Sequence, residues 1–217
     1  MKRTITVKGT GKVTLKPDLT EVTMTLRCLD PDYDRAMGGA SRMLDALRAS
    51  LAEVGFGEDE LKTSDLNVRT EYEGRSDAHG NYKNVFVGYA CVLGLKLEFG
   101  FDTALLSRVL GAISKCVAEP ELSVRFTVRD KDAAGDALLA NAAENALRKA
   151  KVLADASGVG LGQLVSVIYS FADLDMYSPT NYRVEAKCMA MDCAGGMSIV
   201  PDDVKLEDTV TFVWDMA

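Results

Sequence analysis

The residues best suited to chemistry in this 217-residue chain are two cysteines and two methionines near its end. The segment Cys188-Met-Ala-Met-Asp-Cys193 places two thiols and two thioethers within six residues. Such soft ligands suit Cu(I), and two thiols can also act as a redox pair. Zinc sites usually need four ligands, and the sequence has no second closely spaced cysteine pair to complete such a site. A redox or soft-metal role for Cys188 and Cys193 is one hypothesis, and an adaptable methionine-rich contact surface is the other.

The remaining candidates for chemistry are weaker. His79 is the single histidine and lies in a polar loop, which is a poor place to hold a catalytic base. Segment 30–34 (DPDYD) imitates the start of a calcium loop, but Arg35 and Ser41 stand where that loop needs Gly and Glu. Acids there are better explained as the cap of a helix. We expect no catalytic, cofactor-binding or metal-binding residues, and therefore no enzyme.

The other cysteines, Cys28, Cys91 and Cys116, continue apolar patterns and are predicted to be core thiols, which fits a reducing compartment. The net charge of −7 argues against general nucleic-acid binding, because phosphate backbones repel an acidic chain. No segment approaches the ~20 apolar residues that a membrane-spanning helix needs. No signal peptide is visible, so we expect a cytoplasmic protein, or an envelope or secreted one if a leader was removed.

Alternation of apolar residues is strongest from Val85 to Phe99, where every odd position is apolar, and predicts a long strand with one face on a core. We expected this strand to offer an exposed edge for assembly. Shorter alternations predict half-buried strands elsewhere, including one with the apolar residues Val165, Val167, Tyr169 and Phe171. Gly9-Thr10-Gly11 is predicted to be a hairpin turn.

Helical spacing of apolar residues predicts three helices: one after Asp32, one from about 101, and a long alanine-rich one over about 132–157. These elements favour an α+β fold, a layered sandwich of mostly antiparallel sheet with three helices, which allows two lobes sharing a long strand. Segment 84–171 could form a βαβαβ sub-lobe, and segment 172–200 has no period and is predicted to be irregular.

Four segments resemble the SIMPL-domain family in order along nearly the whole chain. ITVKGTGKVTLKPDLTEVTMTL is similar to the family's opening strands, and GFGEDELKTSDLNV to its helix-to-strand junction. FVGYACVLGLKLEF resembles its long Gly-Tyr strand, and KVLADASGVGLGQLVSV its helix end. The chain departs from the family pattern at Thr20, where Ala is usual, and at Asp202, where Gly usually follows Pro201.

The resemblance implies a single SIMPL-like domain over residues 1–217 and no established enzymatic activity. It also implies oligomeric assemblies, bacterial stress responses and, in the founding animal example, a signalling kinase as partner. Many members are envelope or secreted proteins. The leading hypothesis is therefore a non-enzymatic homo-oligomer or protein-interaction module that assembles through sheet edges and segment 172–200. A strict monomer in solution would contradict it.

Overall fold

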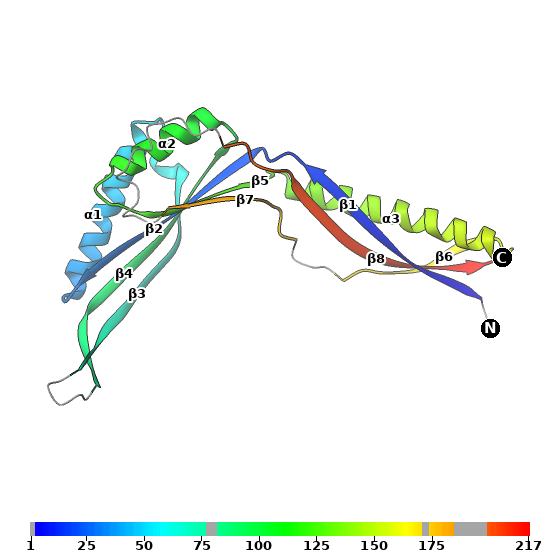
Figure 1. Ribbon diagram of the computed structural model, residues 1–217, viewed down its shortest axis with the longest axis horizontal. Coiled ribbons are helices and arrows are strands. Elements are labelled where there is room, and N and C mark those ends of the chain that lie inside the picture. Colours follow the sequence, from blue (N-terminus) through cyan, green and yellow to red (C-terminus); the bar gives the residue numbers. More distant parts are fainter. Residues whose placement is uncertain (1–2, 77–81, 171–173, 185–198) are drawn as a thin grey trace. The chain divides into compact units, whose positions relative to one another are not determined.

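The computed structural model describes residues 3–76, 82–170, 174–184 and 199–217. The strands in these ranges are β1 (Thr4–Leu15), β2 (Leu19–Asp30), β3 (Leu61–Ser76), β4 (Tyr82–Gly100), β5 (Glu121–Thr127), β6 (Leu161–Ile168), β7 (Tyr177–Val184) and β8 (Val204–Met216). The helices are α1 (Tyr33–Ala52), α2 (Thr103–Lys115), α3 (Lys131–Ala156) and the short 3-10 helix Glu58–Glu60 (Figure 1).

The chain divides into two compact units. The small-sheet unit comprises residues 1–18, 126–179 and 201–217, and its sheet has the strand order β1-β8-β6. The large-sheet unit comprises residues 19–125 and 180–200, and the second sheet has the order β3-β4-β2-β5-β7. The pairs β1–β8, β6–β8, β2–β4 and β3–β4 are antiparallel. The predicted α+β class, with mostly antiparallel sheet and three helices, is confirmed.

The structure differs from the sequence prediction in two segments. Segment 84–171 does follow the order β4-α2-β5-α3-β6, but its strands are divided between the two sheets. Segment 172–200, for which no element was expected, contains β7. Both differences arise because pairing partners can be distant in the chain: β6 joins β8, and the mostly polar β7 joins the far edge of the large sheet.

The prediction of a turn at Gly9-Thr10-Gly11 is wrong. Strand β1 pairs with β8 without a break from Thr4 to Leu15. The two glycines serve packing instead: a Cβ on Gly9 would lie 2.1 Å from the carbonyl oxygen of Ala142, and one on Gly11 would lie 2.2 Å from that of Leu138. Glycine inside a strand marks such a close approach of another backbone as readily as it marks a turn.

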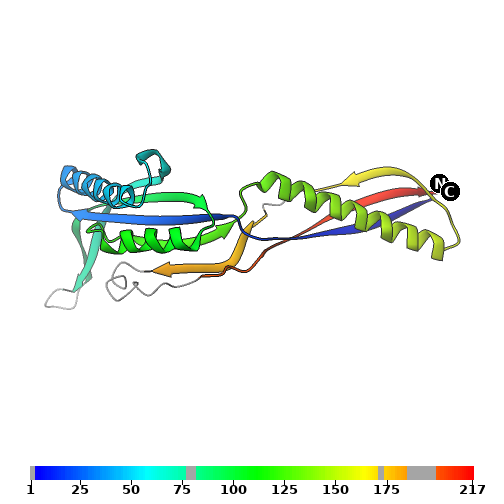
Figure 2. The ribbon, with the colours of Figure 1, turned by 90° about the horizontal axis from the view of Figure 1, so that it is seen from above.

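Helix α3 is the layer that rests on this strand (Figure 2). Its first turn is capped by the Asp130 carboxylate, which accepts a hydrogen bond of 2.8 Å from the Ala133 N–H. One four-residue-spaced row is buried: Ala134, Leu138, Ala142, Ala146, Ala150 and Ala154. Small side chains let the helix axis approach the sheet closely. Helical spacing in the sequence predicts a buried row of Leu139, Ala143, Ala146, Ala150 and Leu153. In the structure Leu139 lies at the flank of the buried row and Leu153 is 49% exposed.

Strand β4 shows the predicted alternation from Cys91 to Phe99, where Leu93, Leu95 and Leu97 are buried in the large-sheet unit. The prediction is wrong for the start of the strand, where Val85 is 40% exposed. Strand β4 lies between β3 and β2, so the expectation that it offers an exposed edge is wrong. Helix α1 packs on β2 and β4, and the Asp32 carboxylate caps it by accepting a 3.0 Å hydrogen bond from the Arg35 N–H. The acids of segment 30–34 therefore include the predicted helix cap.

Candidate functional site

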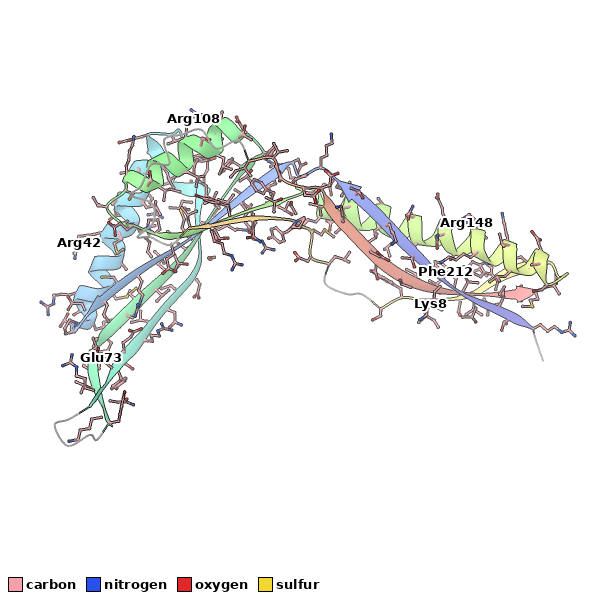
Figure 3. The ribbon with its side chains drawn as sticks, viewed as in Figure 1. Lys8, Arg42, Glu73, Arg108, Arg148 and Phe212 are labelled. Carbon is pink, nitrogen blue, oxygen red and sulfur yellow. The ribbon has the colours of Figure 1, made fainter. Side chains whose placement is uncertain are left out.

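The two sheets end in four edge strands: β1 and β6 in one, β3 and β7 in the other. An unprotected edge presents unpaired N–H and C=O groups to other chains, and proteins blunt it with charges, prolines or a covering element. Strand β3 has charges, with ion pairs Arg69–Glu71 at 3.3 Å and Arg75–Glu73 at 3.0 Å, and Figure 3 labels Glu73. Strand β7 contains Pro179. Both edges of the large sheet are thus protected.

The β1 edge is closed by α3. The side chains that close it are Asn141, Asn145 and Lys149. The Thr10 N–H donates to the Asn145 amide oxygen at 3.2 Å, and the Lys12 N–H donates to that of Asn141 at 2.9 Å. The Lys149 ammonium donates to the Lys8 carbonyl at 3.1 Å. Because these backbone groups already have partners and the strand carries lysines, β1 is a poor template for another chain.

Strand β6 has neither kind of protection. Its sequence, LGQLVSVI, contains no charged residue and no proline. Four large apolar side chains on it are roughly half exposed or more: Leu164 51%, Val165 55%, Val167 49% and Ile168 62%. Among the described residues, β6 pairs with β8 alone. An uncharged, apolar edge of this kind is a pairing template.

The prediction that one face of this strand is buried is wrong, because Val165 and Val167 are exposed. The register of β6 against β8 shifts twice, between Leu161 and Leu164 and between Leu164 and Ser166. Such bulges break the two-residue alternation and bend the strand. Apolar side chains are therefore exposed at consecutive positions of β6. An alternating sequence pattern does not show whether another sheet or helix packs over the apolar face of a strand.

A tyrosine follows the exposed strand. The Tyr169 hydroxyl donates to the Asp208 carboxylate, 3.1 Å away. Desolvation raises the pKa of Tyr169, and the hydrogen bond and negative charge of Asp208 raise it further. The phenol therefore stays protonated and keeps its polar end occupied, while its ring, 36% exposed, extends the apolar surface beyond β6.

A hollow of about 440 Å³ lies at the first half of α3. Its walls combine charged residues of the helix, such as Lys131 and Asp136, with apolar ones such as Leu139 and Met176. The Lys131 ammonium lies 5.2 Å from the centre of the Tyr177 ring, a cation–π distance.

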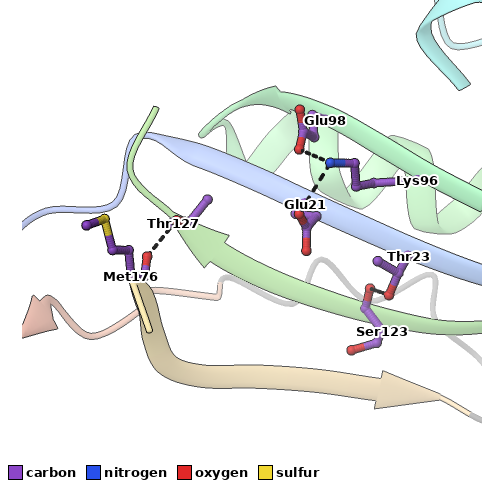
Figure 4. Close-up of polar contacts among 7 residues, drawn as sticks. All are labelled: Glu21, Thr23, Lys96, Glu98, Ser123, Thr127 and Met176. Carbon is purple, nitrogen blue, oxygen red and sulfur yellow. Dashed lines mark hydrogen bonds and ion pairs between the residues drawn. The ribbon is translucent and has the colours of Figure 1, made fainter. Parts of the chain in front are cut away.

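A half-buried lysine in the large-sheet unit joins two carboxylates on the face of β4 opposite its buried row (Figure 4). The Lys96 ammonium lies 2.7 Å from Glu98 and 3.9 Å from the buried Glu21. Glu21 and Glu98 are directly opposed in the β2–β4 register, so the cation offsets the repulsion between them. This cluster is a structural ion pair.

The structure describes only some of the residues that were singled out in the sequence. His79, Cys188 and Cys193 lie outside the described residues. Cys91 and Cys116 are buried, as predicted, whereas Cys28, also predicted to lie in a core, is half-buried. In the described part of the chain, no group of three His, Cys, Asp or Glu side chains is placed to hold a metal ion. No helix in that part is both long and apolar enough to cross a membrane.

The β6 surface was missed by sequence reasoning, although one signal for it exists. The segment from Leu161 to Ile168 is the one predicted strand with apolar residues on both parities and no charge. That pattern was interpreted as a strand with one inward face. Only the sheet order reveals that it lies at an edge.

Comparison with known proteins places these features in a family. The model of the SIMPL family, described as "Protein of unknown function (DUF541)", matches residues 5–214. The "26 kDa periplasmic immunogenic protein" of Brucella melitensis biotype 1 is 26% identical over 176 residues, covering 75% of this chain. The protein of the same name from Brucella abortus is 25% identical over 176 residues. The chain spans 65% of the length of these curated relatives. The family match covers nearly the whole chain, which therefore belongs to the SIMPL family.

Proposed function

We propose that this chain is a non-enzymatic assembly protein whose copies join through the β6 edge of the small sheet. The observation that carries the proposal is the contrast within one sheet: α3 side chains bond three backbone groups of β1, whereas β6 is exposed and apolar. An extended strand added to an open edge gains main-chain hydrogen bonds and side-chain burial together. Such an edge is suited to binding a strand, and a second copy supplies one of matching character.

Charge supports self-pairing. Most closed homo-oligomers contain two-fold interfaces, in which the same patch of each subunit meets its copy. Two β6 strands facing each other bring no like charges together, because the strand has none. The chain as a whole has a net charge of −7, so an uncharged strand is where two copies repel each other least.

The place of action that we propose is the bacterial envelope. The two Brucella relatives are named as periplasmic proteins, which favours the envelope over the cytoplasmic expectation. A stress-related role and a further protein partner, both implied by the family resemblance, would then be served by an assembled form rather than by a catalytic site.

The test is the solution mass of the full chain, measured by light scattering after size exclusion at micromolar concentration. Val167 is opposite Phe212 in the β6–β8 register and is 49% exposed. We expect the parent chain to form a discrete oligomer. Val167→Lys should weaken the association at least tenfold, because it places equal charges in contact across a two-fold interface.

The matched control is Val152→Lys on α3, which makes the same change at a side chain that is 60% exposed in the same unit. This variant should assemble like the parent chain. A monomeric parent chain would overturn the proposal. So would a Val167→Lys variant that assembles as well as the control, because assembly would then use another surface.

A further inference from the structure

Two cysteines distant in the sequence face each other across the large sheet. Cys28 on β2 and Cys91 on β4 are direct partners in the antiparallel register. Directly opposed residues in such a ladder have Cα atoms about 4.5–5.5 Å apart, with side chains on the same face. Disulfides span Cα separations of about 4.4–6.8 Å, so the backbone already holds this pair at bonding distance.

Helix α1 packs directly over the two sulfur atoms. A Cβ on Gly39 would lie 2.3 Å from the Cys28 Sγ, so a larger residue there would collide with the thiol. The Cys91 Sγ lies 3.6 Å from the Sδ of Met37, one of the flexible side chains that adapt to irregular gaps. Glycine at position 39 lets α1 pack against the Cys28 sulfur, and the Met37 side chain over Cys91 is flexible enough to adjust when the two sulfur atoms approach each other.

The two thiols differ in access. Cys91 is fully buried, whereas Cys28 is half-buried and can be reached from solvent. Burial raises the pKa of the Cys91 thiol, and the neighbouring Cys28 raises it further. An accessible thiol beside a protected one is the arrangement in which the first exchanges with an external disulfide and the second resolves the product.

We propose that Cys28 and Cys91 are an oxidation site that closes to a cross-strand disulfide by exchange with a small-molecule disulfide such as oxidised glutathione. The Cys28 thiolate attacks one sulfur of the glutathione disulfide and releases the first glutathione thiolate. The Cys91 thiolate then attacks the Cys28 Sγ in the mixed disulfide and releases the second. The protein thiols lose two electrons and two protons, and the disulfide becomes two thiols, so the exchange balances.

The test uses the full chain with Cys188→Ser and Cys193→Ser, which leaves Cys28, Cys91 and Cys116 as its cysteines. The protein is treated with oxidised glutathione, alkylated, unfolded and digested with trypsin. Cleavage places the three cysteines in different peptides, 28–35, 84–96 and 116–125. We expect loss of two of the three thiols, a linkage between peptides 28–35 and 84–96, and its reversal by dithiothreitol.

Two variants in the same background make the test specific. Cys91→Ser should stop at a mixed disulfide between glutathione and Cys28, because the resolving thiol is gone. Cys116→Ser is the control and should close like the parent, since Cys116 follows α2 on a different element. Unchanged thiols after oxidation, a linkage through Cys116, or closure that survives Cys91→Ser would each overturn the proposal. None of these readouts depends on the proposed assembly.

Discussion

The two edges of the small sheet have the same neighbour, β8, yet opposite surroundings. On β1, two backbone N–H groups and a carbonyl are held by α3 side chains, and glycines let the helix lie directly on the strand. On β6, apolar side chains are exposed and no charge interrupts them. In this sheet α3 covers the β1 edge and leaves the β6 edge exposed, and the proposed assembly rests on that difference.

We expect the largest change in stability from a substitution that disturbs the packing of α3 on β1. Gly11→Ala would place a Cβ 2.2 Å from the Leu138 carbonyl oxygen, so α3 must move away from β1. We expect a loss of about 2–3 kcal/mol in unfolding free energy. Trp214, the single tryptophan, is buried in the α3–β8 core, so its fluorescence during urea unfolding follows this unit.

The control for this substitution is Gly135→Ala within α3. A Cβ on Gly135 meets nothing within 4 Å. Replacing a helical glycine at an open position should stabilise the protein by about 0.5–1 kcal/mol. If both substitutions changed stability in the same direction, the close approach of α3 to β1 would not be what holds this unit together.

A smaller effect is expected from opening the β1 edge without moving the helix. Asn141→Ala and Asn145→Ala each remove one acceptor from a backbone N–H, that of Lys12 and that of Thr10 respectively. Each should cost about 1 kcal/mol of unfolding free energy. The sharper readout is amide hydrogen exchange, which should quicken at Lys12 in the first variant and at Thr10 in the second. Exchange that quickens equally at both amides in both variants would indicate general loosening instead.

The smallest effect is expected from the charges alone. Lys12 forms an exposed ion pair of 3.0 Å with Glu207 on the neighbouring strand β8. Lys12→Ala should change unfolding free energy by no more than about 0.5 kcal/mol, because exposed pairs are well screened. It should also leave the solution mass unchanged, since the amides of α3 still occupy the edge. New association in this variant would mean that charge, and not α3, is what protects β1.

Sequence reasoning located the elements well where one face of each is buried. The alternation in β4 and the cap at Asp32 are both seen in the structure, because burial on one face imposes a period and helix ends need partners for free N–H groups. Sequence reasoning was wrong for glycine, which occurs both in turns and where another backbone packs closely against a strand. Gly9 and Gly11 are typical of a turn, but here they admit a helix.

The candidate surface could not be predicted in the same way. The apolar residues of β6 are visible in the sequence, but whether they face a core depends on which strands and helices lie beside them. The same holds for Cys28 and Cys91, whose apolar settings were predicted and whose opposition across the β2–β4 ladder was not.

By itself, the sequence determined the three helices, most of the strands, the α+β class, the absence of charge in residues 161–168 and the family. These follow from propensity, periodicity and residue type, which act over a few neighbours in the chain. The tertiary structure alone decided that β6 lies at an edge, that α3 closes β1 and that the two cysteines meet. Backbone hydrogen-bonding groups are the same in every strand, so partners are selected by the packing of the whole chain.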